Sequence, residues 1–102
     1  VTAPTDVEED DQIVPEEFTL LQNYPNPFNP STKITYNIPQ RSNVSLKIYD
    51  ILGKEIATLV NEQKEAGTYN IQFDASKLSS GVYIYSIQAG DFLESRKMIL
   101  MK

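Results

Sequence analysis

Apolar and polar side chains alternate in several stretches of the chain after residue 31. Apolar residues occupy every second position in two successive stretches, 34–38 and 44–48. A period of two is typical of half-buried strands. The other stretches predicted to be strands are 18–22, 55–60, 69–73, 82–88 and 92–101, with turn signals between them, and no segment has a helical period. The chain is therefore predicted to be all-β, an antiparallel immunoglobulin-like sandwich of about seven strands.

Two glycines mark turns whose geometry can be predicted. The sequence Asp50-Ile51-Leu52-Gly53 suits a hairpin built on a type I turn with glycine in the left-handed position, although the strand after it, 55–60, has no clean apolar face. Gly81-Val82-Tyr83 resembles a tyrosine corner, in which a tyrosine near the start of a strand bonds to backbone a few residues upstream. We interpret Tyr83 first as a fold residue.

A proline-rich stretch precedes the alternating region. We call it the proline stretch, and it consists of Tyr24, Pro25, Asn26, Pro27, Phe28, Asn29 and Pro30. Proline fixes its own φ and disfavours helix before it, so a stiff, extended crossover is predicted, anchored in the core by Tyr24 and Phe28. Its asparagine side chains should satisfy the nearby backbone without a partner strand. A Pro-x-x-Pro peptide ligand is the less favoured alternative.

Charge divides the chain into two parts. Residues 1–17 hold seven of the 14 acidic residues and no base, which leaves seven acids against nine bases in the remainder. We predict an acidic flexible linker at 1–17 and one folded domain at 18–102. Residues 12–15 of the linker could instead add as a strand to a neighbouring molecule. Because the chain begins at Val1 rather than Met, it is expected to be a piece of a longer protein.

Composition restricts the function as well. The net charge of −5 argues against nucleic acid as a partner, and no apolar run approaches the ~20 residues of a membrane span. The chain has no cysteine and no histidine, so thiolate metal sites and imidazole-based catalysis are excluded. We predict no catalytic residue, cofactor or metal. Carbohydrate binding stays open through Tyr49, Tyr83 and Tyr85 as surface rings, although tyrosines in the core or at its rim are favoured.

The last strand is apolar on both faces, reading Met98-Ile99-Leu100-Met101. An exposed edge strand should alternate, so something should cover its outer face. One interpretation is a central strand lying under the proline stretch or the linker, and the other is a docking surface for a receptor or another subunit. Arg96, Lys97 and Lys102 bracket it with positive charge, which discourages uncontrolled edge pairing.

An ordered set of motifs carries a family resemblance. The motifs are the proline stretch with Ser31-Thr32, Val44-Ser-Leu-Lys-Ile-Tyr-Asp-Ile-Leu-Gly-Lys-Glu55, Ala66-Gly-Thr-Tyr69, Ser80-Gly-Val-Tyr83 and Arg96-Lys-Met-Ile-Leu-Met-Lys102. Together they resemble the type A C-terminal sorting domain of the type IX secretion system, a family similar to the immunoglobulin-like domain of flagellar hook-capping proteins. The resemblance covers about residues 18–102.

The resemblance implies a non-catalytic sorting signal. Such a domain directs a covalently preceding cargo protein, often a hydrolase or adhesin, through the periplasm and across the outer membrane to the cell surface or medium. Its implied partners are the outer-membrane translocon and its processing machinery. The implied recognition residues are Gly81, Tyr83, Lys97, Met98, Ile99, Leu100, Met101 and Lys102. The alternatives are a structural or adhesive surface module that self-associates by strand addition, and a carbohydrate-binding module of a secreted hydrolase.

Overall fold

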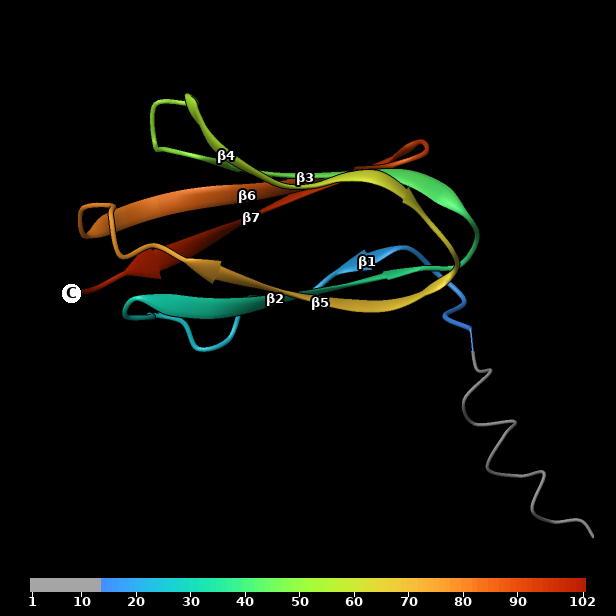
Figure 1. Cartoon of the computed structure of the whole chain (residues 1–102), viewed down its shortest axis with the longest axis horizontal. Helices are drawn as coiled ribbons and strands as arrows, with labels where there is room; N and C mark the ends of the chain where they lie inside the picture. The colour runs from blue at the N-terminus through green and yellow to red at the C-terminus, as the bar shows by residue number, and fades with distance from the viewer. Residues whose placement is uncertain (1–13) are drawn as a thin grey trace, which may run out of the picture.

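A computed structural model describes residues 14–102. In it the chain forms two antiparallel sheets that face each other (Figure 1). Its strands are β1 Thr19–Leu20, β2 Ser31–Ile38, β3 Ser42–Tyr49, β4 Glu55–Lys64, β5 Gly67–Asp74, β6 Gly81–Ala89 and β7 Phe92–Leu100. One sheet has the order β1-β2-β5 and the other β4-β3-β6-β7. The prediction of an all-β antiparallel sandwich of about seven strands is confirmed. From Val14 onward, no helix is long and apolar enough to cross a membrane.

The core lies between the sheets and is built from the alternating positions. Every second residue of β2 and β3 is buried, which confirms the predicted faces of both strands. The side chains with at most 1% exposure include Ile34, Tyr36, Ile38, Val44, Leu46, Ile48, Tyr85, Ile87, Met98 and Leu100. Burying one such side chain is worth about 1.5–3 kcal/mol, so this layer dominates the stability of the fold.

The hairpin between β3 and β4 has the predicted turn. Gly53 has φ 89 and donates its N–H to the Asp50 carbonyl at 3.0 Å, while the Asp50 carboxylate accepts from Leu52 and Lys54. β4 runs four residues further than expected, to Lys64. Its pairing with β3 has two register shifts, which explains why no clean apolar face could be identified in it.

The proline stretch differs from its prediction in shape. It is a bent loop joining β1 and β2, which are neighbouring strands of one sheet, and it is not an extended crossover. It also has partner strands, because Tyr24 exchanges both backbone hydrogen bonds with Lys33 and Phe28 bridges to Leu100 of β7. The loop bends because Phe28 enters the core while its backbone pairs with the end of β7.

Only one of the two predicted anchors is correct. Phe28 is 2% exposed and packs against Phe73 with ring centroids 6.4 Å apart. Tyr24 is 76% exposed, so the prediction that it anchors the loop is wrong. The backbone of Tyr24 pairs with β2, and the anchoring side chain at this end is the adjacent Asn23, 2% exposed, whose Nδ2 donates to Thr32 Oγ1 at 2.9 Å.

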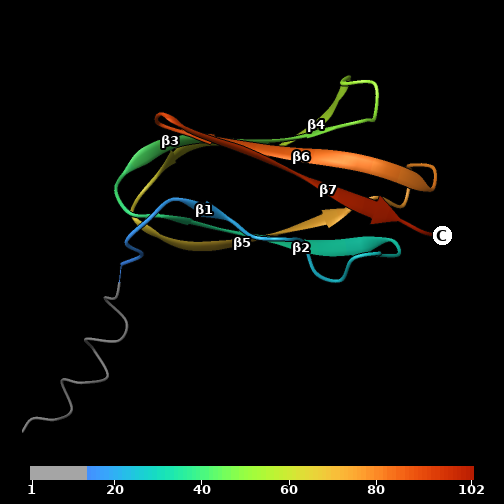
Figure 2. The ribbon, with the colours of Figure 1, turned by 180° about the vertical axis from the view of Figure 1, so that it is seen from behind.

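The two long sides of the sandwich differ. β1 and β7 line the side nearest the viewer in Figure 2, and the residues before β2 join the two sheets there. β4 and β5 line the opposite side, where most of the partly buried apolar residues lie. They are Ile56, Ala57, Leu59, Tyr69, Ile71 and Leu78. We call these the closed side and the open side.

Candidate functional site

β7 is the edge strand of the four-stranded sheet, so the interpretation of a central last strand is wrong. Its burial alternates after all: Met98 and Leu100 point into the core at 0% and 1% exposure, while Ile99 and Met101 are 39% and 59% exposed. Within the described residues, nothing covers the outer face at Ile99. The apolar run thus contributes one pair of residues to the core and one pair to the surface.

The structure brings together the predicted recognition residues of two segments, Gly81 and Tyr83 in β6 and residues 97–102 at the end of the chain. β6 and β7 pair antiparallel, with Gly81 opposite Leu100 and Tyr83 opposite Met98. The chain end is held at the same place, because the Lys102 N–H donates to Ser80 Oγ at 2.9 Å. Gly81 and the last strand therefore form one corner of the sandwich, at the C-terminal end in Figure 1.

The surface of this corner is both apolar and basic. Ile99 lies beside half-buried Val82 on the outer face of the sheet, and Lys97 lies beside Ile84. Lys97 and Lys102 form no ion pair within residues 14–102. We call the exposed residues Gly81, Lys97, Ile99, Met101 and Lys102 the terminal face.

On the closed side, the outer backbone edge of β7 already forms hydrogen bonds with the loop between β1 and β2. Ile99 donates its N–H to Asn26 Oδ1 at 2.9 Å and accepts from the Phe28 N–H at 2.9 Å. Met101 donates to the Phe28 carbonyl, and Gln22 Nε2 donates to the Lys97 carbonyl. An incoming strand would have to displace these bonds, so strand addition at this edge is disfavoured.

Arg96 contributes to the same closure rather than to the terminal face. Its Nε donates to the Leu20 carbonyl at 2.6 Å, and its guanidinium forms an ion pair with Glu94 at 3.3 Å. This contact holds β7 against β1, the first strand of the opposite sheet. The guanidinium thus connects the two sheets of the sandwich.

Tyr83 forms the predicted tyrosine corner. Its hydroxyl donates to the Ser79 carbonyl at 2.7 Å, and the ring is 8% exposed. Gly81 begins β6 with φ 155, a backbone region that is almost restricted to glycine, although a Cβ there would meet no atom within 4 Å. The glycine is thus required by the backbone and not by lack of space.

Replacing Gly81 with alanine is expected to destabilise the domain by about 1–3 kcal/mol, because the new residue would be held in a strained conformation. Ser79→Ala, which keeps the carbonyl that Tyr83 uses, should change stability by less than about 0.5 kcal/mol. Urea unfolding followed by circular dichroism measures both. Equal midpoints for the two variants would refute the requirement for glycine.

Sequence reasoning missed a buried network centred on Tyr85. The Tyr85 hydroxyl accepts the Asn23 N–H and donates to the Leu21 carbonyl, both at 2.7 Å, so it links β6 to the segment after β1. The interpretation of Tyr83 and Tyr85 as surface rings is wrong, since Tyr85 is 0% exposed, and Tyr49 is half-buried. The alternation of β6 could have indicated that Tyr85 is buried, but no sequence signal identifies its partners.

Alkaline pH should weaken the fold through Tyr85. Burial raises the pKa of Tyr85 to about 12, whereas the unfolded chain titrates near 10. The folded state therefore holds a proton that the unfolded state has lost between these values, and stability should fall by about 1.4 kcal/mol per pH unit from pH 10 to pH 12. Burial also raises the pKa of Tyr36, which acts in the same direction.

Tyr85→Phe tests that origin of the pH dependence. Below pH 10 the variant should be about 1–3 kcal/mol less stable, because the Asn23 N–H and the Leu21 carbonyl lose their partner. Above pH 10 its stability should fall less steeply than that of the parent, because the variant lacks the one proton that Tyr85 retains in the folded state. Parallel stability curves for the two proteins across this range would contradict the assignment.

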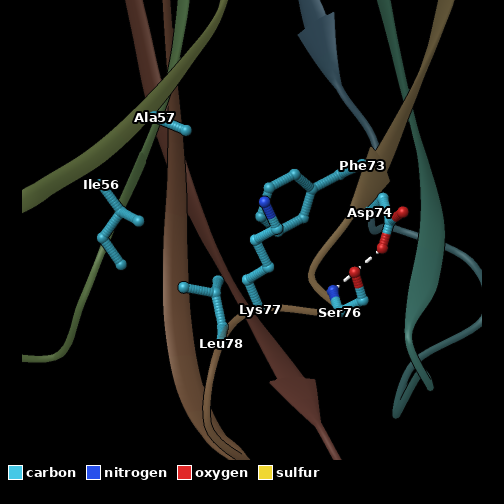
Figure 3. Close-up of a pocket in the computed structure, with 7 residues that line it drawn as sticks. All are labelled: Ile56, Ala57, Phe73, Asp74, Ser76, Lys77 and Leu78. Atoms are coloured by element: carbon cyan, nitrogen blue, oxygen red, sulfur yellow. Dashed lines mark hydrogen bonds between the residues drawn. The ribbon is translucent and has the colours of Figure 1, made fainter.

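A hollow of about 270 Å³ opens on the open side of the sandwich (Figure 3). It is lined by Ile56, Ala57, Phe73, Asp74, Ser76, Lys77 and Leu78. Phe73 and Lys77 both line it, and Asp74 accepts the Ser76 N–H at 2.9 Å, which caps the turn. Its lining combines four apolar side chains with Asp74, Ser76 and Lys77.

Within residues 14–102, no group of three acidic side chains is placed to hold a metal ion. The chain matches the family described as the secretion system C-terminal sorting domain over residues 22–101. It belongs to this family. A search of curated proteins found no match.

Membership gives the chain a role in type IX secretion. A sorting domain of this family is a C-terminal signal, is in general non-catalytic, and is attached to the cargo protein that it delivers to the cell surface or medium. It interacts with the secretion machinery. The matched residues begin just after β1 and include the proline stretch and all of the terminal face except Lys102.

Proposed function

We propose that this sorting domain is recognised as a folded unit by the outer-membrane translocon after its cargo has reached the periplasm. The observation that supports this most is the corner formed by Gly81 and the last strand. It combines exposed apolar side chains with basic side chains that form no ion pair, on a backbone edge that is already hydrogen-bonded. Within this proposal, Lys97, Ile99 and Met101 contact the translocon. Tyr83, Met98 and Leu100 act indirectly, because they hold the strand in the core.

The chemistry of the terminal face indicates the complementary surface. Ile99 and Met101 offer apolar contact area. Lys97 and Lys102 offer two charges that form no ion pair in the described domain, and the Lys102 ammonium donates to the Ser76 carbonyl at 2.6 Å. A matching surface is apolar at its centre and acidic at its rim. Rim charges act mainly on association rate, so raised salt should slow recognition more than it accelerates release.

A fusion experiment tests the proposal. A periplasmic reporter carrying residues 18–102 at its C-terminus should reach the surface or medium in a host with a functional type IX system. The reporter alone, and the fusion in a host lacking that system, should stay in the periplasm. Surface delivery that does not depend on the secretion system would refute the proposal.

A further inference from the structure

β5 exposes a free backbone edge on the open side of the sandwich. On its other side it pairs with β2, with Tyr36 opposite Tyr69. The Thr35 carbonyl accepts from the Leu21 N–H, in the segment after β1, so Thr35 faces away from β5. Its neighbours in β2, Ile34 and Tyr36, therefore form the backbone hydrogen bonds to β5. By the same alternation, three residues in the interior of β5 direct their N–H and C=O groups away from the sheet. They are Thr68, Asn70 and Gln72.

This edge lacks the features that usually prevent strands from pairing. From Gly67 to Phe73 it carries no charge and no proline, and its one charged residue is Asp74 at the last position. Within the described residues, both outer edges of the four-stranded sheet are protected: β7 is covered by the proline stretch, and β4 carries charged residues at Glu55, Glu62 and Lys64 and two register shifts. Natural sheets block exposed edges with charge, proline or bulges, so the unprotected edge of β5 indicates a binding surface.

We propose that this edge pairs antiparallel with β5 of a second copy, about a two-fold axis at Ile71. The strand is complementary to itself in this register. Ile71 faces Ile71 of the second copy, and Tyr69 faces Phe73 on the side toward the core. Asn70 faces Gln72 on the outer side, and no like charges meet. The three-stranded sheets of the two copies thereby join into one continuous sheet with an isologous interface.

The packing of side chains on the open side supports pairing with a second copy. Tyr69 and Ile71 are only partly buried in the single chain, as are Ile56 and Leu59 on the facing strand β4. A second β5 beside the first places its own Ile71 and Phe73 next to these side chains. The pairing therefore completes an apolar layer as well as a hydrogen-bonded ladder.

Charge substitutions at the outward positions test the register. In N70K/Q72K each introduced lysine faces a lysine of the second copy, whereas in N70K/Q72E each lysine faces a glutamate. Sedimentation equilibrium of the full 102-residue chain up to about 1 mM should show association of the parent and of N70K/Q72E, but only monomer for N70K/Q72K. Urea unfolding shows whether both variants remain folded. A parent that stays monomeric, or folded variants that associate equally, overturns the proposal.

Cysteine cross-linking gives a second, independent readout. The chain has no cysteine, so a single substituted thiol reports one contact. Positions facing each other in a non-hydrogen-bonded pair lie about 4.5–5.5 Å apart at Cβ, close to the range of a disulfide. I71C should form a disulfide-linked dimer in a glutathione buffer much faster than Q88C, which places the thiol at an exposed position on β6. Equal rates for the two variants overturn the proposed axis.

Discussion

Replacing Phe28 with alanine should destabilise the domain by about 3–5 kcal/mol, the cost of removing a buried aromatic ring. The ring is 2% exposed and fills the space between Phe73 and the end of β7. Its loss also loosens the loop that covers the edge of β7, because the Phe28 backbone bonds to Ile99 and Met101. Urea unfolding monitored by circular dichroism measures the change.

Tyr24→Ala is the matched control, four residues away in the same loop. Because Tyr24 is 76% exposed, this substitution should change stability by less than about 0.5 kcal/mol. Comparable losses for both variants would mean that the loop is anchored at two aromatic residues, contrary to the structure.

Leu100→Ala should cost about 2–5 kcal/mol, because it leaves a cavity in the core at the end of β7. Leu100 is 1% exposed and lies opposite Gly81, so the loss should reach the corner that carries the terminal face. Met101→Ala, one position later and 59% exposed, should be nearly neutral for stability. Thermal unfolding of the pair measures the difference, and equal melting temperatures would contradict the inward orientation of Leu100.

Truncating the chain after Arg96 would therefore be a poor test of recognition. It removes Met98 and Leu100 from the core together with Ile99 and Met101 from the surface. Loss of secretion by such a variant would follow from unfolding as readily as from loss of a contact. Point substitutions on the exposed side separate the two causes.

Alternation predicted most of the fold. It identified the strands at 34–38, 44–48 and 69–73 and their buried faces, because a period of two specifies which side chains point inward. The hairpin at Gly53 and the tyrosine corner at Tyr83 were also predictable, since each depends on bonds within a few residues.

Contacts between distant segments could not be predicted. Tyr24 and Phe28 look alike in sequence, and only the pairing of Tyr24 with Lys33 and of Phe28 with β7 determines which of them is buried. The position of β7 at a sheet edge depends on strand order, which local patterns do not encode. Local chemistry likewise does not reveal that Asn23 and Tyr85 meet across 62 residues.

The acidic linker at 1–17 and its alternative, a donated strand at 12–15, remain predictions, and residues 1–13 lie outside the described residues. Val14, Glu16 and Glu17 are exposed. The family match begins later, at residue 22.

The most direct test of the terminal face measures surface delivery of a reporter fused to residues 18–102. It compares substitutions at two exposed sites, one in the terminal face and one at the other end of β7. I99S/M101S changes the terminal face, and L93S changes a side chain that is 68% exposed at the other end of the strand. Both variants should unfold at the same temperature as the parent. The account predicts that I99S/M101S leaves the reporter in the periplasm while L93S is delivered normally. Equal delivery of the two folded variants would contradict it.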